Sequence, residues 1–238
     1  MLNSRKTESS SKSTRRERKA QKTREGILKA ASALFREHSY ENVKVEDISE
    51  RADVSRATVY NYFESKEDIY YEIGIQGFKT MNERQKVVIS SELSGLEKII
   101  KLSKDALKFL FENSVIHEIL RHYLITNLQA ETPAHETLSK MLQGEKVKDR
   151  SDILRARYLQ EIRKFQEIWV ETINLGFEDG TIHHELNADQ LSRFLFMVIS
   201  GIFDRAQIEQ MALERAELTE EHIIELAGDL IWKGISKN

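Results

Sequence analysis

The sequence predicts an all-α fold in which a small N-terminal helical domain precedes a larger helical domain. Two observations support this prediction. The 238 residues include only ten Gly and one Pro, too few for the closely spaced turns of a β-sandwich or barrel. Apolar residues recur three and four positions apart along most of the chain, which is the spacing of one face of an α-helix.

Composition limits the chemistry that the chain can carry. Cys is absent, which excludes disulfides, thiolate metal sites and a cysteine nucleophile and fits a reducing compartment. The longest apolar run, residues 195–199, is far shorter than the roughly 20 residues of a membrane-spanning helix. Residues 2–26 are too polar for a secretory signal. We therefore expect a cytoplasmic protein with no membrane partner.

Charge is distributed unevenly along the chain. Residues 1–22 hold eight Lys or Arg and two Glu, whereas the net charge of the whole chain is −3. A basic end on an acidic body indicates a polyanion met by the N-terminus. The alternative is a tail that only keeps the chain in solution. Residues 1–12 are rich in Ser, Lys and Glu, and we expect them to be disordered.

The segment that follows is expected to begin with two helices. The first helix starts near Ser13 or near Thr23 and ends around residues 38–40. A second helix of about two turns comes next. The apolar stripes that define them are Ile27, Ala30, Ala31, Leu34 and Phe35 in the first helix, and Val45, Ile48 and Ala52 in the second.

A turn and a third helix complete this segment. Asp53-Val54 forms the turn, and Ser55 is a good N-cap for a helix that runs to Phe63. Ser65 caps the helix after it. Three short helices, the last two joined by a tight turn, indicate a helix-turn-helix. In such a unit the second helix of the motif enters the major groove of DNA.

The third helix has the two faces that DNA reading requires. Val54, Val59 and Phe63 supply an apolar inner side. Arg can bind guanine and Asn can bind adenine through two hydrogen bonds each, while Thr and Tyr hydroxyls suit phosphate oxygens. The polar residues available on the outer side are Arg56, Thr58, Tyr60, Asn61 and Tyr62.

The spacing of apolar residues predicts helices throughout the rest of the chain. Asn187 and Thr219 stand where N-caps belong for the last two helices. These two helices also carry the strongest apolar stripes. The expected helices span residues 66–90, 96–112, 115–128, 134–143, 151–178, 188–213 and 220–236.

Residues 23–70 resemble the N-terminal DNA-binding domain of TetR-family transcriptional regulators. The resemblance covers about 48 residues, and its most specific part is Thr58-Val59-Tyr60-Asn61-Tyr62-Phe63 followed by Lys66-Glu67-Asp68. It implies a flexible basic arm over residues 1–22, a helix-turn-helix domain over 23–68, and a helical ligand-binding and dimerisation domain over 69–238.

The resemblance also implies roles for individual residues. Base edges or the adjacent backbone would be contacted by Arg56, Ala57, Tyr60 and Asn61, and phosphates would be bound by Thr58, Tyr62 and Lys66. Ser55 would lie at the N-terminus of the recognition helix, where free N–H groups favour a phosphate.

The sequence departs from the family pattern in three places, one of which is a pair of residues. Ser39 and Asp53 stand where the family has Gly, which is tolerable because both residue types are frequent in turns. Val43-Lys44 replaces a pair of Thr at the start of the second helix, and Lys44 can hold the same phosphate as a point charge.

The resemblance suggests a role in DNA binding for the basic N-terminal arm. An arm before a helix-turn-helix can lie in the minor groove or along phosphates. The alternative is a mobile tail that adds only salt-sensitive, non-specific affinity. The residues concerned are Arg15, Arg16, Arg18, Lys19 and Lys22.

For the larger domain the resemblance implies a homodimer and a small hydrophobic effector, such as a fatty acyl compound or a drug. The helices at 188–213 and 220–236 would form the dimer interface. Bulky residues of the central helices are as consistent with a packed core as with an effector pocket. The residues assigned to effector binding are Phe78, Phe109, Tyr123, Phe165, Trp169 and Phe177.

The sequence thus predicts a homodimeric, nucleoid-associated repressor that an effector releases from a palindromic operator on double-stranded DNA. We find no nucleophile–base set, no phosphate-binding Gly-rich loop and no metal-ligand spacing, so we expect no enzyme activity, no metal and no cofactor. The alternatives are a helix-turn-helix protein that anchors a protein partner on DNA, and a helical lipid-binding protein with a vestigial DNA-binding head.

Overall fold

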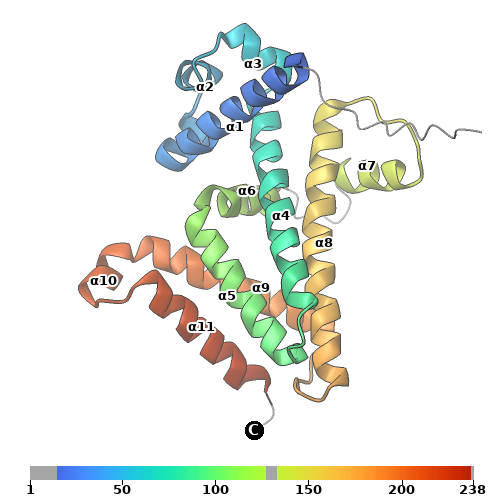
Figure 1. The fold of residues 1–238 in the computed structure, drawn as a ribbon, viewed down its shortest axis with the longest axis vertical. Coiled ribbons are helices and arrows are strands. Elements are labelled where there is room, and N and C mark those ends of the chain that lie inside the picture. The colour runs from blue at the N-terminus through green and yellow to red at the C-terminus, as the bar shows by residue number, and fades with distance from the viewer. Residues whose placement is uncertain (1–14, 127–132, 237–238) are drawn as a thin grey trace, which may run out of the picture. The chain divides into compact units, whose positions relative to one another are not determined.

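The computed structural model describes residues 15–126 and 133–236, so the expected disorder of residues 1–12 lies outside the described residues. The described chain is a series of helices (Figure 1), and its one β pairing is an isolated bridge between Ile182 and Ser236. The all-α prediction is therefore confirmed. The chain forms two compact units, residues 1–69 and 70–238.

The first unit contains α1 (Arg15–Asn42), α2 (Val45–Arg51), α3 (Arg56–Tyr62) and the first turn of α4 (Lys66–Ile89). Helix α1 begins at Arg15, so the part of the expected flexible arm from Arg15 to Lys22 is helical, and residues 1–14 of that arm lie outside the described residues. The expected apolar stripes form the interior of this unit, whose buried apolar side chains include Ile27, Ala31, Phe35, Ile48, Val59, Phe63 and Ile69.

Over the residues that the structure describes, the second unit contains the remainder of α4 and seven further helices. The expected helices are all present to within two residues over the described chain, except that the expected helix at 188–213 is divided at Glu209. Asn187 and Thr219 act as N-caps, since their side chains accept from the N–H groups of Gln190 and His222. The helices are α5 (Gly95–Glu112), α6 (Ser114–Thr126), α7 (Pro133–Leu142), α8 (Arg150–Glu178), α9 (Ala188–Ile208), α10 (Gln210–Arg215) and α11 (Glu220–Ile235).

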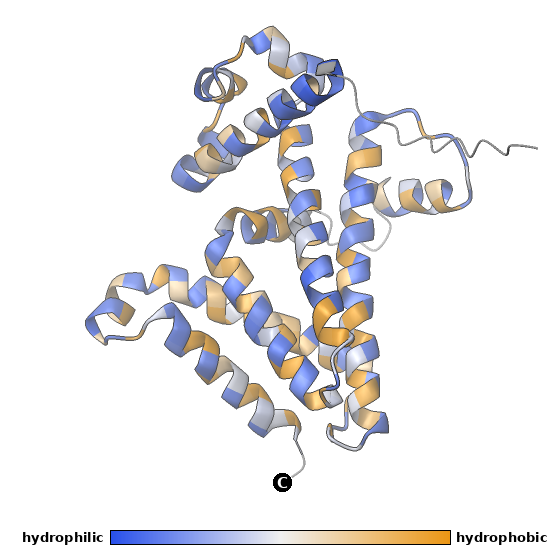
Figure 2. Ribbon diagram, viewed as in Figure 1, coloured by the Kyte–Doolittle hydropathy of each residue, from blue (hydrophilic) through white to orange (hydrophobic). Residues whose placement is uncertain are grey.

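Helix α8 is the long central element of this second unit, and α5, α7 and α9 pack against it. Helix α11 packs on the side of α5 (Figure 1). Apolar and polar residues are mixed along every helix (Figure 2), as expected for amphipathic helices that share a core. Over the residues that the structure describes, no helix is both long enough and apolar enough to cross a bilayer.

The start of α5 crosses the end of α8 at a contact between two glycines. A Cβ on Gly95 would lie 2.2 Å from the backbone nitrogen of Gly176. The loop after α8 also caps α5, because Gly95 N donates to Asp179 Oδ2 (2.7 Å) and Leu96 N donates to Thr181 Oγ1 (3.1 Å). The close approach therefore satisfies two of the N–H groups that a helix start leaves without partners.

We expect Gly95→Ala to lower the free energy of unfolding by about 1–3 kcal/mol, the usual cost of forcing an extra group into a packed contact. Urea unfolding of the purified protein measures the change. Gly26→Ala is the control, because a Cβ at that exposed position in α1 meets nothing within 4 Å and Ala favours the helix by about 1 kcal/mol. Equal stability of Gly95→Ala and the wild type would contradict the assigned contact.

Candidate nucleic-acid interface

The helix-turn-helix consists of α2, α3 and the turn between them. Asp53 in this turn has a φ of 53°, and Val54 N donates to Ser49 O (3.0 Å). Ser55 is the N-cap of α3, as predicted, because Ser55 Oγ accepts from Thr58 N (3.1 Å). Ser55 Oγ and Thr58 Oγ1 also share a hydrogen bond of 2.8 Å. The two hydroxyls therefore order the start of α3.

Helix α3 has an apolar inner side and a polar outer side. Val59 and Phe63, at its end, are 1% and 2% exposed and belong to the core of the first unit. On the outer side four of the expected DNA-contacting residues are exposed, namely Arg56, Ala57, Tyr60 and Asn61, while Thr58 and Tyr62 are half-buried. The side chains expected to read bases thus share one accessible surface.

Arg56 is held by a residue that sequence reasoning missed. Its Nη1 lies 2.6 Å from Glu46 Oε1 on α2, and its guanidinium lies 5.5 Å from the centre of the Tyr60 ring. A hydrogen bond with Tyr60 and the nearby charge of Glu46 raise the pKa of Arg56. Glu46 therefore orients Arg56 across the face of the motif. The available sequence signal was an acidic residue on the polar side of α2.

Lys44 precedes α2 and is exposed. Its backbone N–H donates to Asp47 Oδ2 (2.8 Å), which is the acidic half of a capping box. The Lys44 side chain accepts no hydrogen bond from the first turn of α2, as a hydroxyl at this position would. A second contact secures α2, because Arg51 makes two hydrogen bonds to the carboxylate of Glu37 on α1, at 2.5 and 2.8 Å. The ammonium of Lys44 remains accessible on the surface.

Lys66 lies in a different environment from the one expected of a phosphate contact. Its Nζ donates to Tyr40 O (2.7 Å) and Val43 O (2.9 Å) and lies 4.1 Å from the centre of the Tyr40 ring. Burial lowers the pKa of Lys66. The ammonium is thus engaged by the connection between α1 and α2, because carbonyls at a helix end need donors. In this structure Lys66 fixes the motif rather than extending from it.

Ser39 and Asp53 both adopt a left-handed backbone. Ser39 has φ 59° and ψ 160° and interrupts α1, and Asp53 has φ 53°. These are the two positions where the resemblance expects Gly. The conformation of Ser39 is one that residues other than Gly rarely adopt. Both positions therefore have a positive φ, which Gly would adopt without strain.

The residues expected to bind an effector fall into three environments in the second unit. Phe78, Phe165 and Trp169 form a continuous ring cluster, with centroids 5.8 Å and 5.6 Å apart. Tyr123 joins this cluster through the ring of Tyr158. The remaining two lie apart from it, with Phe109 beneath the guanidinium of Arg84 and Phe177 half-buried near the end of α8. The clustered rings are in direct contact with one another.

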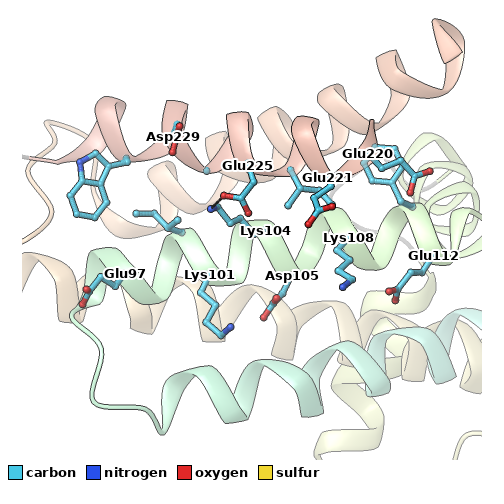
Figure 3. Close-up of a pocket in the computed structure, with 15 residues that line it drawn as sticks. Glu97, Lys101, Lys104, Asp105, Lys108, Glu112, Glu220, Glu221, Glu225 and Asp229 are labelled. Carbon is cyan, nitrogen blue, oxygen red and sulfur yellow. Dashed lines mark hydrogen bonds and ion pairs between the residues drawn. The ribbon is translucent and has the colours of Figure 1, made fainter. Parts of the chain in front are cut away.

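A groove of about 740 Å³ lies between α5 and α11 (Figure 3). It is lined mainly by charged residues, and none of the six expected effector residues is among them. Lys104 on α5 forms an ion pair with Glu225 on α11 (2.5 Å) and packs across Gly228. Charges of both signs face each other along this groove, so it differs from the apolar pocket that the sequence led us to expect.

We expect Ser39→Gly to raise the free energy of unfolding by about 1 kcal/mol, because Gly adopts positive φ without strain. Chemical denaturation measures the change. Ser39→Ala is the matched control: it also removes the hydrogen bond from Asn42 Nδ2 (3.2 Å) but leaves the backbone strained. If the Ala variant proved as stable as the Gly variant, the strain would not be real.

Comparison with known proteins places the motif in a family. A model described as bacterial regulatory proteins, tetR family, matches residues 27–73. The repressor KstR2 of Mycobacterium tuberculosis is 25% identical over 171 residues, which are 71% of this chain and 74% of that protein. Its solved structure, that of a ketosteroid transcriptional regulator, covers 90% of this chain and 95% of its own, with a TM-score of 0.63 and 18% identity.

Two further solved structures share the fold. FadR of Bacillus subtilis, in complex with stearoyl-CoA, covers 85% of this chain and 96% of its own, with a TM-score of 0.59 and 18% identity. SmeT of Stenotrophomonas maltophilia, in complex with triclosan, covers 91% and 93%, with a TM-score of 0.63 and 17% identity. These relatives are transcriptional regulators, not enzymes. Residues 27–73 therefore form a DNA-binding domain of the tetR family, and the chain as a whole shares the fold of these regulators.

Proposed function

We propose that this protein is a homodimeric repressor that binds a palindromic operator and releases it when a small effector binds the second unit. The observation that supports this most is the outer side of α3. Arg56, Tyr60 and Asn61 are exposed there, while Val59 and Phe63 are buried behind them. A short helix with this division of faces suits insertion into a major groove.

Within this proposal the residues of the motif have separate roles. Arg56 and Asn61 carry the hydrogen-bonding groups that distinguish bases. Lys44, Tyr60 and Tyr62 bind phosphates, which fix the register of the protein on DNA. Ser55, Ala57 and Thr58 line the start of the helix close to the backbone. Lys66 acts indirectly, by holding the connection between α1 and α2.

A homodimer is supported by apolar residues left exposed on α9 and α11. Phe194 and Met197 on α9 are 49% and 64% exposed, and Leu226 and Leu230 on α11 are 53% and 65% exposed. Apolar side chains gathered on one part of a surface usually mark an interface. We propose a second copy as the occupant, because two half-sites of a palindrome require two reading helices related by twofold symmetry.

An effector site in the second unit is supported by the relatives. FadR is in complex with stearoyl-CoA and SmeT with triclosan, and KstR2 is a ketosteroid regulator. We place the effector of this protein at the aromatic cluster of Phe78, Phe165 and Trp169. Helix α4 gives its first turn to the DNA-binding unit and the rest to the second unit, so it can couple the two. The effector must prefer the conformation that does not bind DNA.

We expect Arg56→Ala to weaken operator binding about 10- to 100-fold, the value of one bidentate base contact. Gel retardation on the upstream region of the protein's own gene, with competitor DNA present, measures the affinity. Lys108→Ala removes the same charge from exposed α5 and should bind as the wild type does. Wild-type affinity of Arg56→Ala would rule out α3 as the reading helix.

We expect Leu230→Glu to convert a dimer into a monomer, because it places two charges in the proposed apolar interface. Light scattering coupled to gel filtration gives the mass directly. Val87→Glu is the control, since Val87 is 71% exposed on α4, away from the proposed interface. A wild-type protein that runs as a monomer at micromolar concentration would overturn this part of the proposal.

A further inference from the structure

Glu46 on α2 and Arg56 on α3 form an ion pair on the exposed side of the helix-turn-helix. Glu46 Oε1 lies 2.6 Å from Arg56 Nη1, and the two side chains are 51% and 60% exposed. The Arg56 guanidinium lies 5.5 Å from the centre of the Tyr60 ring, and Tyr60 is 42% exposed. We call Glu46, Arg56 and Tyr60 the Arg56 cluster. The cluster places a carboxylate on the surface that is proposed to meet DNA.

Stability gives little reason to keep this ion pair. Exposed ion pairs contribute little to folding, because the attraction is weak in water and two long side chains lose freedom. The first turn of α2 has a second acidic residue, Asp47, which accepts from the backbone N–H of Lys44. The favourable negative charge at the start of α2 is therefore present without Glu46. The pairing of Glu46 with Arg56 is better explained by what the two residues do on DNA.

A carboxylate that faces DNA needs a hydrogen-bond donor, because phosphates repel it and it can only accept hydrogen bonds. In the major groove the base donors are N4 of cytosine and N6 of adenine, whereas guanine and thymine present oxygen acceptors. Adenine also presents N7, an acceptor beside N6, while cytosine presents its donor alone. Among the four bases, cytosine therefore suits Glu46 best.

The same ion pair affects what Arg56 can bind. A guanidinium donates two hydrogen bonds to O6 and N7 of guanine. The contacts with Glu46 and Tyr60 restrict the directions in which Arg56 can point, so less side-chain freedom is lost when it meets a base. The nearby carboxylate also offsets its charge, which weakens its attraction to an isolated phosphate. Glu46 therefore favours a base contact by Arg56 over a phosphate contact.

We propose that Glu46 determines sequence specificity: it holds Arg56 for a guanine and accepts a hydrogen bond from N4 of a cytosine in the neighbouring base pair. This inference rests on the proposed function, because it names the bases that the reading surface contacts. It gives α2 a base-contacting residue, which the sequence did not indicate.

Selection of bound sequences from random double-stranded DNA tests this pairing. We expect wild-type sites to contain a guanine and, in the next base pair, a cytosine that keeps the same strand relative to it in every site. Replacing that cytosine should weaken binding about 5- to 10-fold. In Glu46→Gln the new amide can both accept and donate, which matches N6 and N7 of adenine. The selected base should therefore change from cytosine to adenine, while the guanine is retained.

Glu50→Gln is the matched control for this selection. It removes the same charge from another exposed residue of α2, and it should select the same sites as the wild type. Circular dichroism should show both variants folded, since both side chains are exposed. A Glu46→Gln variant that selected the wild-type bases, or a Glu50→Gln variant that changed the same base, would overturn the proposal.

Binding to a duplex without the selected site gives a second test, followed by fluorescence anisotropy between about 50 and 200 mM salt. Glu46→Gln frees Arg56 to neutralise one phosphate. Its slope of log K against log salt should therefore be steeper than that of the wild type by about 0.9, and Glu50→Gln should leave the slope unchanged. Equal slopes for Glu46→Gln and the wild type would mean that Glu46 does not restrain Arg56, contrary to the proposal.

The selection experiment separates this inference from the proposed function. A wild type that selected no sequence at all would overturn the proposed function, and this inference with it. A wild type that selected a palindrome shared in every position by Glu46→Gln would overturn this inference alone, and the proposed repressor role would stand.

Discussion

A helix of seven residues is too short to persist in water by itself, and this constraint governs the DNA-binding unit. Both α2 and α3 have this length, so each depends on residues that it buries. Helix α3 is held by Val59, Phe63 and the Ser55 cap. Because stability requires apolar groups inside, the polar groups of α3 are left outside. The exposure of the polar side of α3, which is proposed to contact DNA, is therefore a consequence of burying the apolar residues that stabilise the helix.

Much of this unit could be predicted from the sequence because its determinants are local. The caps at Ser55 and Ser65 act on groups three residues away, within the reach of a motif. Lys66 could not be predicted in this way, since its partners are carbonyls 23 and 26 positions earlier. Every residue has a carbonyl, so sequence gives no sign of which one will accept. The link between Glu46 and Arg56 was missed for a similar reason.

In the second unit the apolar periodicity predicted where the helices lie. It did not predict which side of each helix is buried in the core and which side is exposed. On α9 the buried Leu191 and Leu195 and the exposed Phe194 and Met197 merge into one broad apolar stripe. Sequence alone therefore cannot separate core from interface. Asn82 and Gln85 on α4 posed the opposite difficulty, since amide side chains are typical of a solvated surface but these two are buried. Only their burial, which depends on how α4 meets α8, reveals them as interior groups.

The loop that follows α8 gathers the ends of several helices. Asp179 and Thr181 hold the first N–H groups of α5, and two residues further on His183 N donates to Ile235 O at the end of α11 (2.9 Å). An insertion or deletion between Thr181 and His183 would displace the contacts with α11 relative to those with α5. This loop should therefore vary little in length among related chains, although loops are usually where length varies most.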